Sequence, residues 1–278
     1  MECLRINPSA SMGVEPLVFL HEGLGSVAMW RNFPQLLCAA TGRAGLVYSR
    51  RGYGQSESIA DVRGAGRLQP DYMHREAFDV LPELLRKEGV ARPVLVGHSD
   101  GGTIALLFAS KFPTTACIVM APHLFVEDIS LRAISQAREA FMRGDLRERL
   151  AKYHADPDCA FWQWNDIWLS PAFRSFNIEA ECEQIACALL AIQGTEDAYG
   201  SMAQMDALCK MPNDRNASHQ RVFLSEKEPL PANHLRRALL KLERCGHSPH
   251  RDHPQRVITA ITDWLAQPAQ ALGSLSPD

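Results

Sequence analysis

The amino-acid sequence predicts an α/β protein with a doubly wound, mostly parallel sheet and an inserted helical cap. Short apolar runs alternate with longer segments in which apolar residues recur every three or four positions, as in βαβ units. One long stretch, residues 124–185, has helical patterns but no strand-like run. The balance of 46% hydrophobic and 22% charged residues is that of a globular chain with a substantial core.

Strands are predicted where short apolar runs end in glycine or in a polar residue. The predicted strands are residues 16–21, 45–49, 93–97, 117–121, 188–194 and 239–242. Helical spacing of apolar residues predicts helices at residues 30–39, 75–87, 101–112, 203–209 and 255–266. The polar, proline-containing stretch 213–233 is expected to form a loop, and the tail after residue 266 is expected to be frayed.

Residues 124–185 are predicted to form the cap, and residues 1–123 and 186–278 the core domain. The cap is rich in aromatic residues, among them Trp162, Trp164 and Trp168. Large aromatic side chains dominate both protein cores and ligand pockets. The sequence therefore leaves two interpretations open: these side chains form the cap's own core, or they line a substrate pocket.

A nucleophilic serine is indicated by the pentapeptide Gly97-His98-Ser99-Asp100-Gly101, which fits the pattern G-x-S-x-G. The pentapeptide follows a predicted strand and opens a predicted helix. In that context a sharp turn raises the serine Oγ above the sheet edge. The competing interpretation is a glycine-rich turn whose serine caps the helix. The strand–turn–helix context favours the nucleophile.

Two further motifs, G-T-E-D at residues 194–197 and C-G-H-S-P at residues 245–249, resemble motifs of the α/β-hydrolase superfamily. The resemblance implies that His247, after the last predicted strand, is the general base, and that a carboxylate after the preceding strand orients its imidazole. The distance from the end of that strand favours Asp197 over the adjacent Glu196 as this carboxylate.

These motifs resemble those of the α/β-hydrolase superfamily, and the resemblance extends from about residue 16 to residue 266. It implies the α/β-hydrolase fold and the chain order Ser99, Asp197, His247 for the catalytic residues. The segment H-E-G-L-G-S after the first predicted strand is similar to the family's oxyanion loop. On that alignment the backbone N–H groups of Gly23 and Asp100 bind the oxyanion.

Two positions depart from the family's pattern. Glu22 stands where the oxyanion loop usually has glycine, and a carboxylate there opposes developing negative charge unless it points away or is paired. Ser49 replaces an aspartate in the sequence S-R-R-G-Y-G-Q-S, which is similar to a turn of the family and is interpreted as structural. That segment lacks the lysine of a phosphate-binding loop.

The charge distribution points to a small-molecule substrate and to no nucleic acid or membrane partner. Net charge is −3, without a run of Lys or Arg, and no window reaches the ~20 apolar residues of a membrane span. No secretory signal is recognisable, so the protein is expected to be cytoplasmic with its eight scattered cysteines reduced. The sequence gives no indication of oligomeric state.

No metal or organic cofactor is expected. His247, His250, Asp252 and His253 lie close together, but their spacing is not that of a zinc site. Three other histidines, His98, His123 and His154, are interpreted as pocket or supporting residues because His247 already fills the role of base.

The leading functional prediction is a serine hydrolase that cleaves an ester or thioester of a small carboxylic acid through an acyl group on Ser99. Relatives with the same catalytic residues include carbon–carbon bond hydrolases and lyases, so this alternative stays open. A third class is a non-catalytic ligand-binding protein. The Asp100 side chain either binds a cationic group of the substrate, or caps its helix or pairs with an arginine of the cap.

Overall fold

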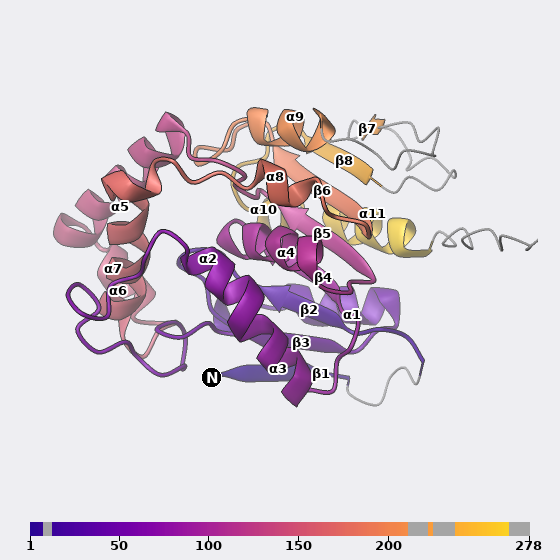
Figure 1. The fold of residues 1–278 in the computed structure, drawn as a ribbon, viewed down its shortest axis with the longest axis horizontal. Helices are drawn as coiled ribbons and strands as arrows, with labels where there is room; N and C mark the ends of the chain where they lie inside the picture. Colours follow the sequence, from indigo (N-terminus) through magenta and orange to yellow (C-terminus); the bar gives the residue numbers. More distant parts are fainter. Residues whose placement is uncertain (8–12, 211–221, 225–236, 267–278) are drawn as a thin grey trace, which may run out of the picture.

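An eight-stranded sheet forms the centre of the molecule in the computed structural model, which describes residues 1–7, 13–210, 222–224 and 237–266 (Figure 1). Its strand order is β1-β3-β2-β4-β5-β6-β8-β7, and β1 alone runs antiparallel to its neighbour. The strands are β1 (Cys3–Ile6), β2 (Leu17–Leu20), β3 (Gly45–Tyr48), β4 (Val94–His98), β5 (Ala116–Met120), β6 (Ala188–Gly194), β7 (Val222–Leu224) and β8 (Arg237–Leu242). The predicted mostly parallel α/β sheet is confirmed.

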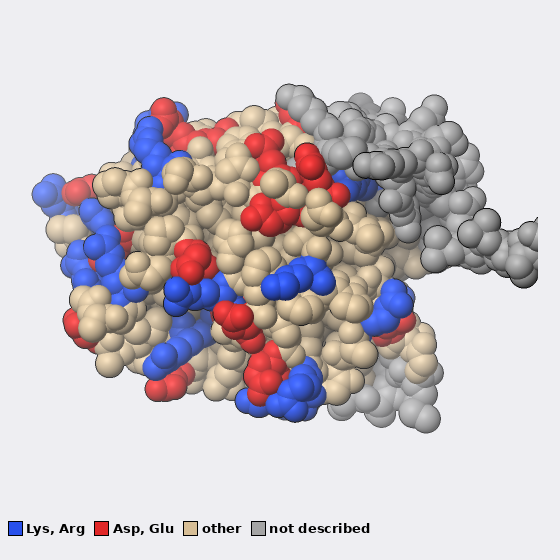
Figure 2. Space-filling model, in the orientation of Figure 1, with Lys and Arg blue, Asp and Glu red and all other residues tan. Residues whose placement is uncertain are grey.

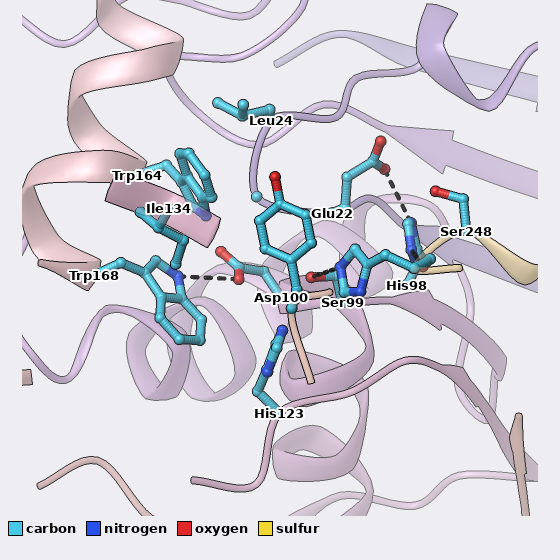
Figure 3. A pocket seen from close by; sticks show the side chains of 13 residues that line it. Glu22, Leu24, His98, Ser99, Asp100, His123, Ile134, Trp164, Trp168 and Ser248 are labelled. Atoms are coloured by element: carbon cyan, nitrogen blue, oxygen red, sulfur yellow. Dashed lines mark hydrogen bonds and ion pairs between the residues drawn. The ribbon is translucent and has the colours of Figure 1, made fainter. Parts of the chain in front are cut away.

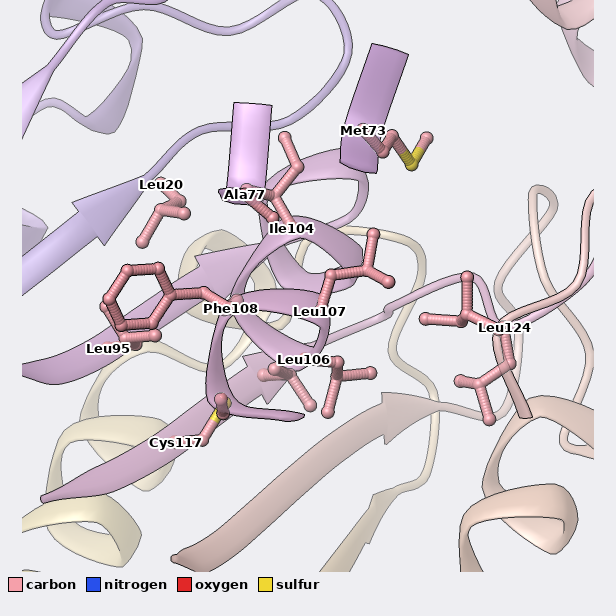
Figure 4. Close-up of a cluster of buried hydrophobic side chains, with 14 of the residues drawn as sticks. Leu20, Met73, Ala77, Leu95, Ile104, Leu106, Leu107, Phe108, Cys117 and Leu124 are labelled. Atoms are coloured by element: carbon pink, nitrogen blue, oxygen red, sulfur yellow. The ribbon is translucent and has the colours of Figure 1, made fainter. Parts of the chain in front are cut away.

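Both faces of the central strands are buried, because helices cover both sides of a parallel sheet. In β2, Leu17 and Phe19 belong to one hydrophobic cluster, and Val18 and Leu20 belong to the other. This division arises because successive side chains of a strand point to opposite faces. Figure 4 shows Leu20 in its cluster with Phe108 of α4 (Asp100–Lys111). Burial on both faces explains why the strands are continuous apolar runs in the sequence.

The helices of the core divide between the two faces of the sheet (Figure 1). On one face, α1 (Phe33–Thr41) packs beside α11 (Pro254–Ala266). The other face carries α2 (Tyr72–Arg75), η2 (Glu76–Val80), α3 (Leu81–Lys87) and α4. The remaining core helices are η1 (Ala28–Trp30), α9 (Ala203–Lys210) and α10 (Pro249–Asp252).

The helix predicted at residues 75–87 begins earlier, at Tyr72, and its middle section η2 is a π-helix. Pro82 in α3 has no N–H, so it cannot donate to the carbonyl of Phe78 as a regular α-helix requires. Widening of the helix by one π turn before the proline lets the chain continue in the same direction.

Two strands were not predicted from the sequence. β1 is half exposed and antiparallel at the sheet edge, so it lacks a continuous apolar run. β7 has only three residues and lies within the stretch 213–233, for which a loop was expected; that expectation is wrong at residues 222–224. The rest of this stretch and the tail after residue 266 lie outside the described residues.

Helical elements occupy the chain between β5 and β6, as Figure 1 shows. They are α5 (Asp128–Arg143), α6 (Leu146–Leu150), α7 (Pro157–Trp168), η3 (Pro171–Phe173) and α8 (Glu179–Cys182). Within this segment the rings of Phe141 and Phe161 stack with centroids 3.8 Å apart. We refer to residues 124–185 as the cap; their treatment as a unit separate from the core remains a prediction.

Acidic and basic side chains alternate on the face shown in Figure 2, including the part formed by the cap helices. No helix among the described residues is long and apolar enough to cross a membrane. No disulfide joins the seven cysteines whose side chains are described. Within the same residues, no group of three or more His, Cys, Asp or Glu side chains is arranged to hold a metal ion.

Candidate active site

Ser99 lies at a sharp turn between β4 and α4, with a backbone φ of 52° that residues other than glycine rarely adopt. The turn requires glycine on both sides. A Cβ atom on Gly97 would overlap the carbonyl of Gly101, and one on Gly101 would overlap the carbonyl of Leu20. The Ser99 amide donates to the Met120 carbonyl at 2.9 Å, which ties the turn to β5. The strand–turn–helix context predicted from the sequence is therefore present.

The structure brings Ser99, His247 and Asp197 into one hydrogen-bonded chain. His247 Nε2 lies 2.9 Å from Ser99 Oγ, and His247 Nδ1 lies 2.9 Å from both carboxylate oxygens of Asp197. Glu196, the other carboxylate that the sequence allowed, is exposed and makes no such contact. The three residues come from loops after β4, β6 and β8, which are brought together because the carboxyl ends of parallel strands share one edge of the sheet.

Asp197 is held as an anion by its surroundings. Its carboxylate accepts hydrogen bonds from the backbone amides of Tyr199 and Gly200, at 2.7 and 3.2 Å, and from Gln193 Nε2 at 2.8 Å. Burial alone would raise the pKa of this carboxyl, but hydrogen bonding to His247 and to these amides outweighs burial and lowers it. The arrangement fixes the imidazole with Nε2 toward Ser99.

His98 supports His247 from the side away from the cap. His98 Nε2 donates to the His247 carbonyl oxygen at 2.7 Å, and His98 Nδ1 lies 3.4 Å from Glu22 (Figure 3). Arg251 also pairs with Glu22, at 3.1 Å. Burial opposes ionisation of Glu22, but its pairing with His98 and the charge of Arg251 bring its pKa well below the usual value. Glu22 is thus paired, so its negative charge is balanced and need not oppose the charge that develops on an oxyanion.

Gly23 and Asp100, the two residues expected to donate backbone N–H groups to an oxyanion, line the same cavity as Ser99. A Cβ atom on Gly23 would overlap the indole of Trp164, so glycine is required there. The loop is held by Arg50, which is buried and donates to the carbonyls of His21 and Glu22 at 2.6 and 3.1 Å. Sequence reasoning missed this role, although Arg50 lies in the turn it had identified.

A cavity of about 110 Å³ opens above Ser99 between core and cap. The cap contributes Ile134, Trp164 and Trp168 to its lining. Trp162 is not among the lining residues: its ring packs against the Arg63 guanidinium at 3.9 Å and against the hydrophobic core, which for this residue favours the alternative of a cap core. Along a helix, Trp164 and Trp168 share a face that Trp162 does not.

The core contributes further side chains to this cavity. They include Leu24, His98, His123 and Tyr199. His154 lies elsewhere, with its ring nitrogens toward the Gly54 amide and the Leu24 carbonyl.

The Asp100 carboxylate faces the cavity and is already paired. Tyr72 donates its hydroxyl to Asp100 Oδ2 at 2.7 Å, and Trp168 Nε1 lies 3.3 Å from Oδ1 (Figure 3). Arg50 lies 3.9 Å from Oδ2. Burial raises the pKa of Asp100, and the charge of Arg50 opposes the rise. Pairing with an arginine of the cap was one of the alternatives that the sequence left open for Asp100; the arginine near it, Arg50, belongs to the core, in the turn after β3.

Comparison with known proteins gives a matching family and several relatives. A family model described as "Alpha/beta hydrolase family" matches residues 17–260. The enzymes named 2-succinyl-6-hydroxy-2,4-cyclohexadiene-1-carboxylate synthase of Shigella flexneri and Escherichia coli are 26% identical to the chain over 268 and 267 residues. The alignments cover 91% of this chain and 95% and 94% of those enzymes.

Solved structures share the fold at low sequence identity. A carboxylesterase structure from Nitrososphaera gargenis has a TM-score of 0.68 at 16% identity, covering 95% of this chain and 93% of that one. A thermophilic esterase from Thermogutta terrifontis has a TM-score of 0.65 at 19% identity, covering 95% and 98%. The enol-lactonase of Burkholderia xenovorans has a TM-score of 0.63 at 18% identity, covering 95% of each chain.

Proposed function

Because the chain belongs to the alpha/beta hydrolase family, we propose that it is a serine hydrolase that cleaves the ester of a small carboxylic acid whose acyl group carries no charge. A thioester of the same acid is the alternative substrate. The observation that carries the proposal is the unbroken hydrogen-bonded chain from Ser99 through His247 to Asp197, which ends at a small cavity. That arrangement is the one by which serine is made nucleophilic near neutral pH.

In the proposed mechanism His247 accepts the proton of Ser99 Oγ as the oxygen attacks the substrate carbonyl. Asp197 stabilises the imidazolium that forms and keeps Nε2 directed at the reacting atoms. His247 then gives the proton to the leaving group, and the acyl group stays on Ser99. A water molecule deprotonated by His247 releases the acid. No step requires a metal or organic cofactor.

The backbone N–H groups of Gly23 and Asp100 are proposed to bind the oxyanion of the tetrahedral intermediate. Both residues lie beside Ser99 on the cavity wall, and Asp100 is the first residue of α4, whose positive end favours negative charge. Removal of one such donor typically costs about 3 kcal/mol of transition-state stabilisation.

The charges around the cavity support an uncharged acyl group. Among the described residues, no Lys or Arg lines the cavity, and its two carboxylates belong to Glu22 and Asp100. A substrate with several carboxylates would find no counter-ion, and uncompensated charge is costly to bury. The volume of about 110 Å³ is below the ~150 Å³ of a cavity that holds benzene, so it suits a short acyl chain.

A second candidate is the reaction of the synthases to which the chain is 26% identical over 268 residues. In such carbon–carbon chemistry Ser99 and His247 would remove a proton from the substrate instead of forming an acyl group. The name of those enzymes specifies a succinyl group and a carboxylate, and the lack of a cation in the described cavity lining argues against the same substrate here.

Labelling with a fluorophosphonate, located by mass spectrometry, tests the proposal without knowledge of the substrate. We expect one adduct, on Ser99, that is absent from Ser99→Ala and from His247→Ala. Nitrophenyl esters of two- to four-carbon acids should then be hydrolysed with burst kinetics. Folded protein that is neither labelled nor active on these esters would refute serine hydrolase activity, and turnover of a succinyl-bearing diene precursor would favour the second candidate.

A further inference from the structure

One wall of the cavity, which we call the polar wall, consists of Asp100, His123 and Trp168. The Trp168 indole joins the other two: its Nε1 lies 3.3 Å from Asp100 Oδ1, and its ring contacts the His123 ring edge to face with centroids 4.9 Å apart. All three side chains are buried, and all three line the cavity. The cavity therefore has a polar surface that the proposed mechanism does not use.

The polar wall lies where the acyl chain of an ester would extend. His247 must protonate the leaving group, so the leaving group lies on the His247 side of Ser99. His247 is held by His98, and Figure 3 shows His98 on one side of Ser99 with Asp100 and Trp168 on the other. Asp100 and Trp168 thus lie on the side of the acyl chain, and the His123 ring, whose centroid is 5.7 Å from that of the His247 ring, lies near enough to Ser99 to meet the first atoms of that chain.

The His123 imidazole has an unsatisfied nitrogen. Its backbone is fixed, since its amide donates to Thr103 Oγ1 at 3.0 Å and its carbonyl accepts from the same hydroxyl at 2.8 Å. Its Nδ1 is buried and has no hydrogen-bond partner among the described residues. Figure 3 shows the ring pointing toward Ser99 and Asp100. Buried imidazoles ordinarily satisfy their polar atoms, so this one needs an explanation.

The burial of His123 determines what it offers to a ligand. Burial, reinforced by the nearby His247, lowers the pKa of His123 to about 3, so the ring is neutral near pH 7. A neutral ring carries one N–H, and a buried N–H without an acceptor costs more than an unfilled acceptor. We therefore assign the proton to Nε2, at the end of the ring that points into the cavity.

Asp100 offers the complementary group. Its Oδ2 accepts the short bond from Tyr72 and faces Arg50, whereas Oδ1 has only the 3.3 Å contact with Trp168. A carboxylate oxygen accepts two hydrogen bonds, so Oδ1 has room for one more donor. The positive charge of Arg50 already balances the carboxylate, so the cavity does not need an ammonium group.

We propose that the polar wall recognises a hydroxyl group on the acyl chain, which accepts a hydrogen bond from His123 Nε2–H and donates one to Asp100 Oδ1. The substrate class is then the ester of a small hydroxy acid, and the inference rests on the proposed ester hydrolysis. A hydroxyl is the smallest neutral group that donates and accepts at once. An ammonium cannot accept from His123, and a carboxylate would be repelled by Asp100.

The kinetic test compares ester pairs that differ by one hydroxyl: nitrophenyl lactate with nitrophenyl propionate, and nitrophenyl 3-hydroxybutyrate with nitrophenyl butyrate. After correction for spontaneous hydrolysis, we expect kcat/KM of at least one hydroxy ester to exceed that of its partner by about tenfold or more. In His123→Phe this ratio should collapse toward one. His123→Gln, whose side-chain amide can again donate a hydrogen bond, should restore part of the ratio.

The matched control is His250→Phe. His250 is also buried, and neither of its ring nitrogens has a hydrogen-bond partner among the described residues, but it packs against Trp30 and does not line the cavity. The preference for hydroxy esters should survive this change, which separates recognition from a general effect of losing a buried imidazole. Equal kcat/KM for both members of both pairs in the unaltered protein would overturn the proposal, as would an unchanged ratio in His123→Phe.

Binding to the Ser99→Ala variant tests recognition without turnover. Calorimetry should find methyl lactate or methyl 3-hydroxybutyrate bound about tenfold more tightly than its deoxy counterpart, with the difference lost when His123→Phe is added. If no ester is hydrolysed but this preference persists, the proposed ester hydrolysis is wrong, whereas recognition of a hydroxyl by the polar wall is supported. If esters are hydrolysed but neither hydroxy ligand is preferred, the polar wall proposal fails alone.

Discussion

The two sides of the cavity differ in how their polar groups are satisfied. On one side, every polar side-chain atom of Ser99, His247 and Asp197 has a hydrogen-bond partner within the protein. On the polar wall, the His123 ring has a buried nitrogen with no hydrogen-bond partner among the described residues. A fully paired set of groups is positioned before the substrate arrives, which suits chemistry common to many esters. A group without a hydrogen-bond partner suits recognition, because a particular substrate can supply the missing partner.

The largest effect is expected on the paired side, from Ser99→Ala. Loss of the nucleophile should lower kcat for ester hydrolysis by about 10⁴- to 10⁶-fold, as for other hydrolases in which the three groups act as a unit. Steady-state assays on a nitrophenyl ester measure this loss, with the melting temperature as the control for folding. Residual activity within tenfold of the unaltered protein would mean that another group attacks the carbonyl.

Asp197→Asn should have the next largest effect. The amide can present an N–H to His247 Nδ1, which favours the wrong tautomer, and kcat should fall by about 10⁴-fold with little change in KM. Glu196→Gln is the matched control, because it changes the adjacent exposed carboxylate and should leave kcat within about twofold. A large loss in the Glu196 variant with little in the Asp197 variant would reverse the assignment made by the geometry.

A smaller effect is expected on the polar wall, from Trp168→Phe. This change removes the indole N–H shared by Tyr72 and Asp100 and leaves space beside His123. We expect kcat/KM to fall by about tenfold and stability by about 1–2 kcal/mol. Trp162→Phe is the control, since that ring lies in the same helix but outside the cavity. Equal losses of activity in both variants would show that Trp168 has no specific role in the cavity and that weaker packing of the cap accounts for the loss.

A further effect, on stability and not on turnover, is expected in the acid dependence of unfolding. The folded-state pKa of His123 is lowered to about 3 from its unfolded value near 6.5, so the unfolded chain binds more protons between these values. Stability should therefore fall with decreasing pH across this window, by up to about 1.4 kcal/mol per pH unit from this residue. His21 and His250, whose pKa values burial also lowers, add to the slope.

Urea unfolding at several pH values between 4 and 7 measures that slope. His123→Gln removes one titrating group and should flatten the curve, whereas Glu196→Gln should not. An unaltered slope in His123→Gln would show that the imidazole is protonated in the folded protein, which would also contradict its assignment as a neutral hydrogen-bond donor.

The positions of the six central strands and of the nucleophile are determined by the sequence itself. The six central strands are visible because burial on both faces demands unbroken apolar runs, as in Leu17–Leu20. Ser99 is visible because its turn tolerates only glycine at positions 97 and 101. The edge strands were missed for the converse reason: β1 is half exposed and β7 has three residues, so neither has a distinctive pattern.

Only the tertiary structure decided which neighbouring side chains face the cavity. Asp197 and Glu196 are neighbouring carboxylates, and Trp162 and Trp164 are indole rings two residues apart on one helix, so residue type cannot separate the members of either pair. Their directions follow from how the loop after β6 and helix α7 pack on the core. The partners of Asp100 were equally hidden, because Tyr72 and Arg50 are distant in sequence and reach it only when α2 and the turn after β3 lie against α4. Such orientations are fixed by packing between segments that are distant in sequence, and a local sequence pattern carries no information on that packing.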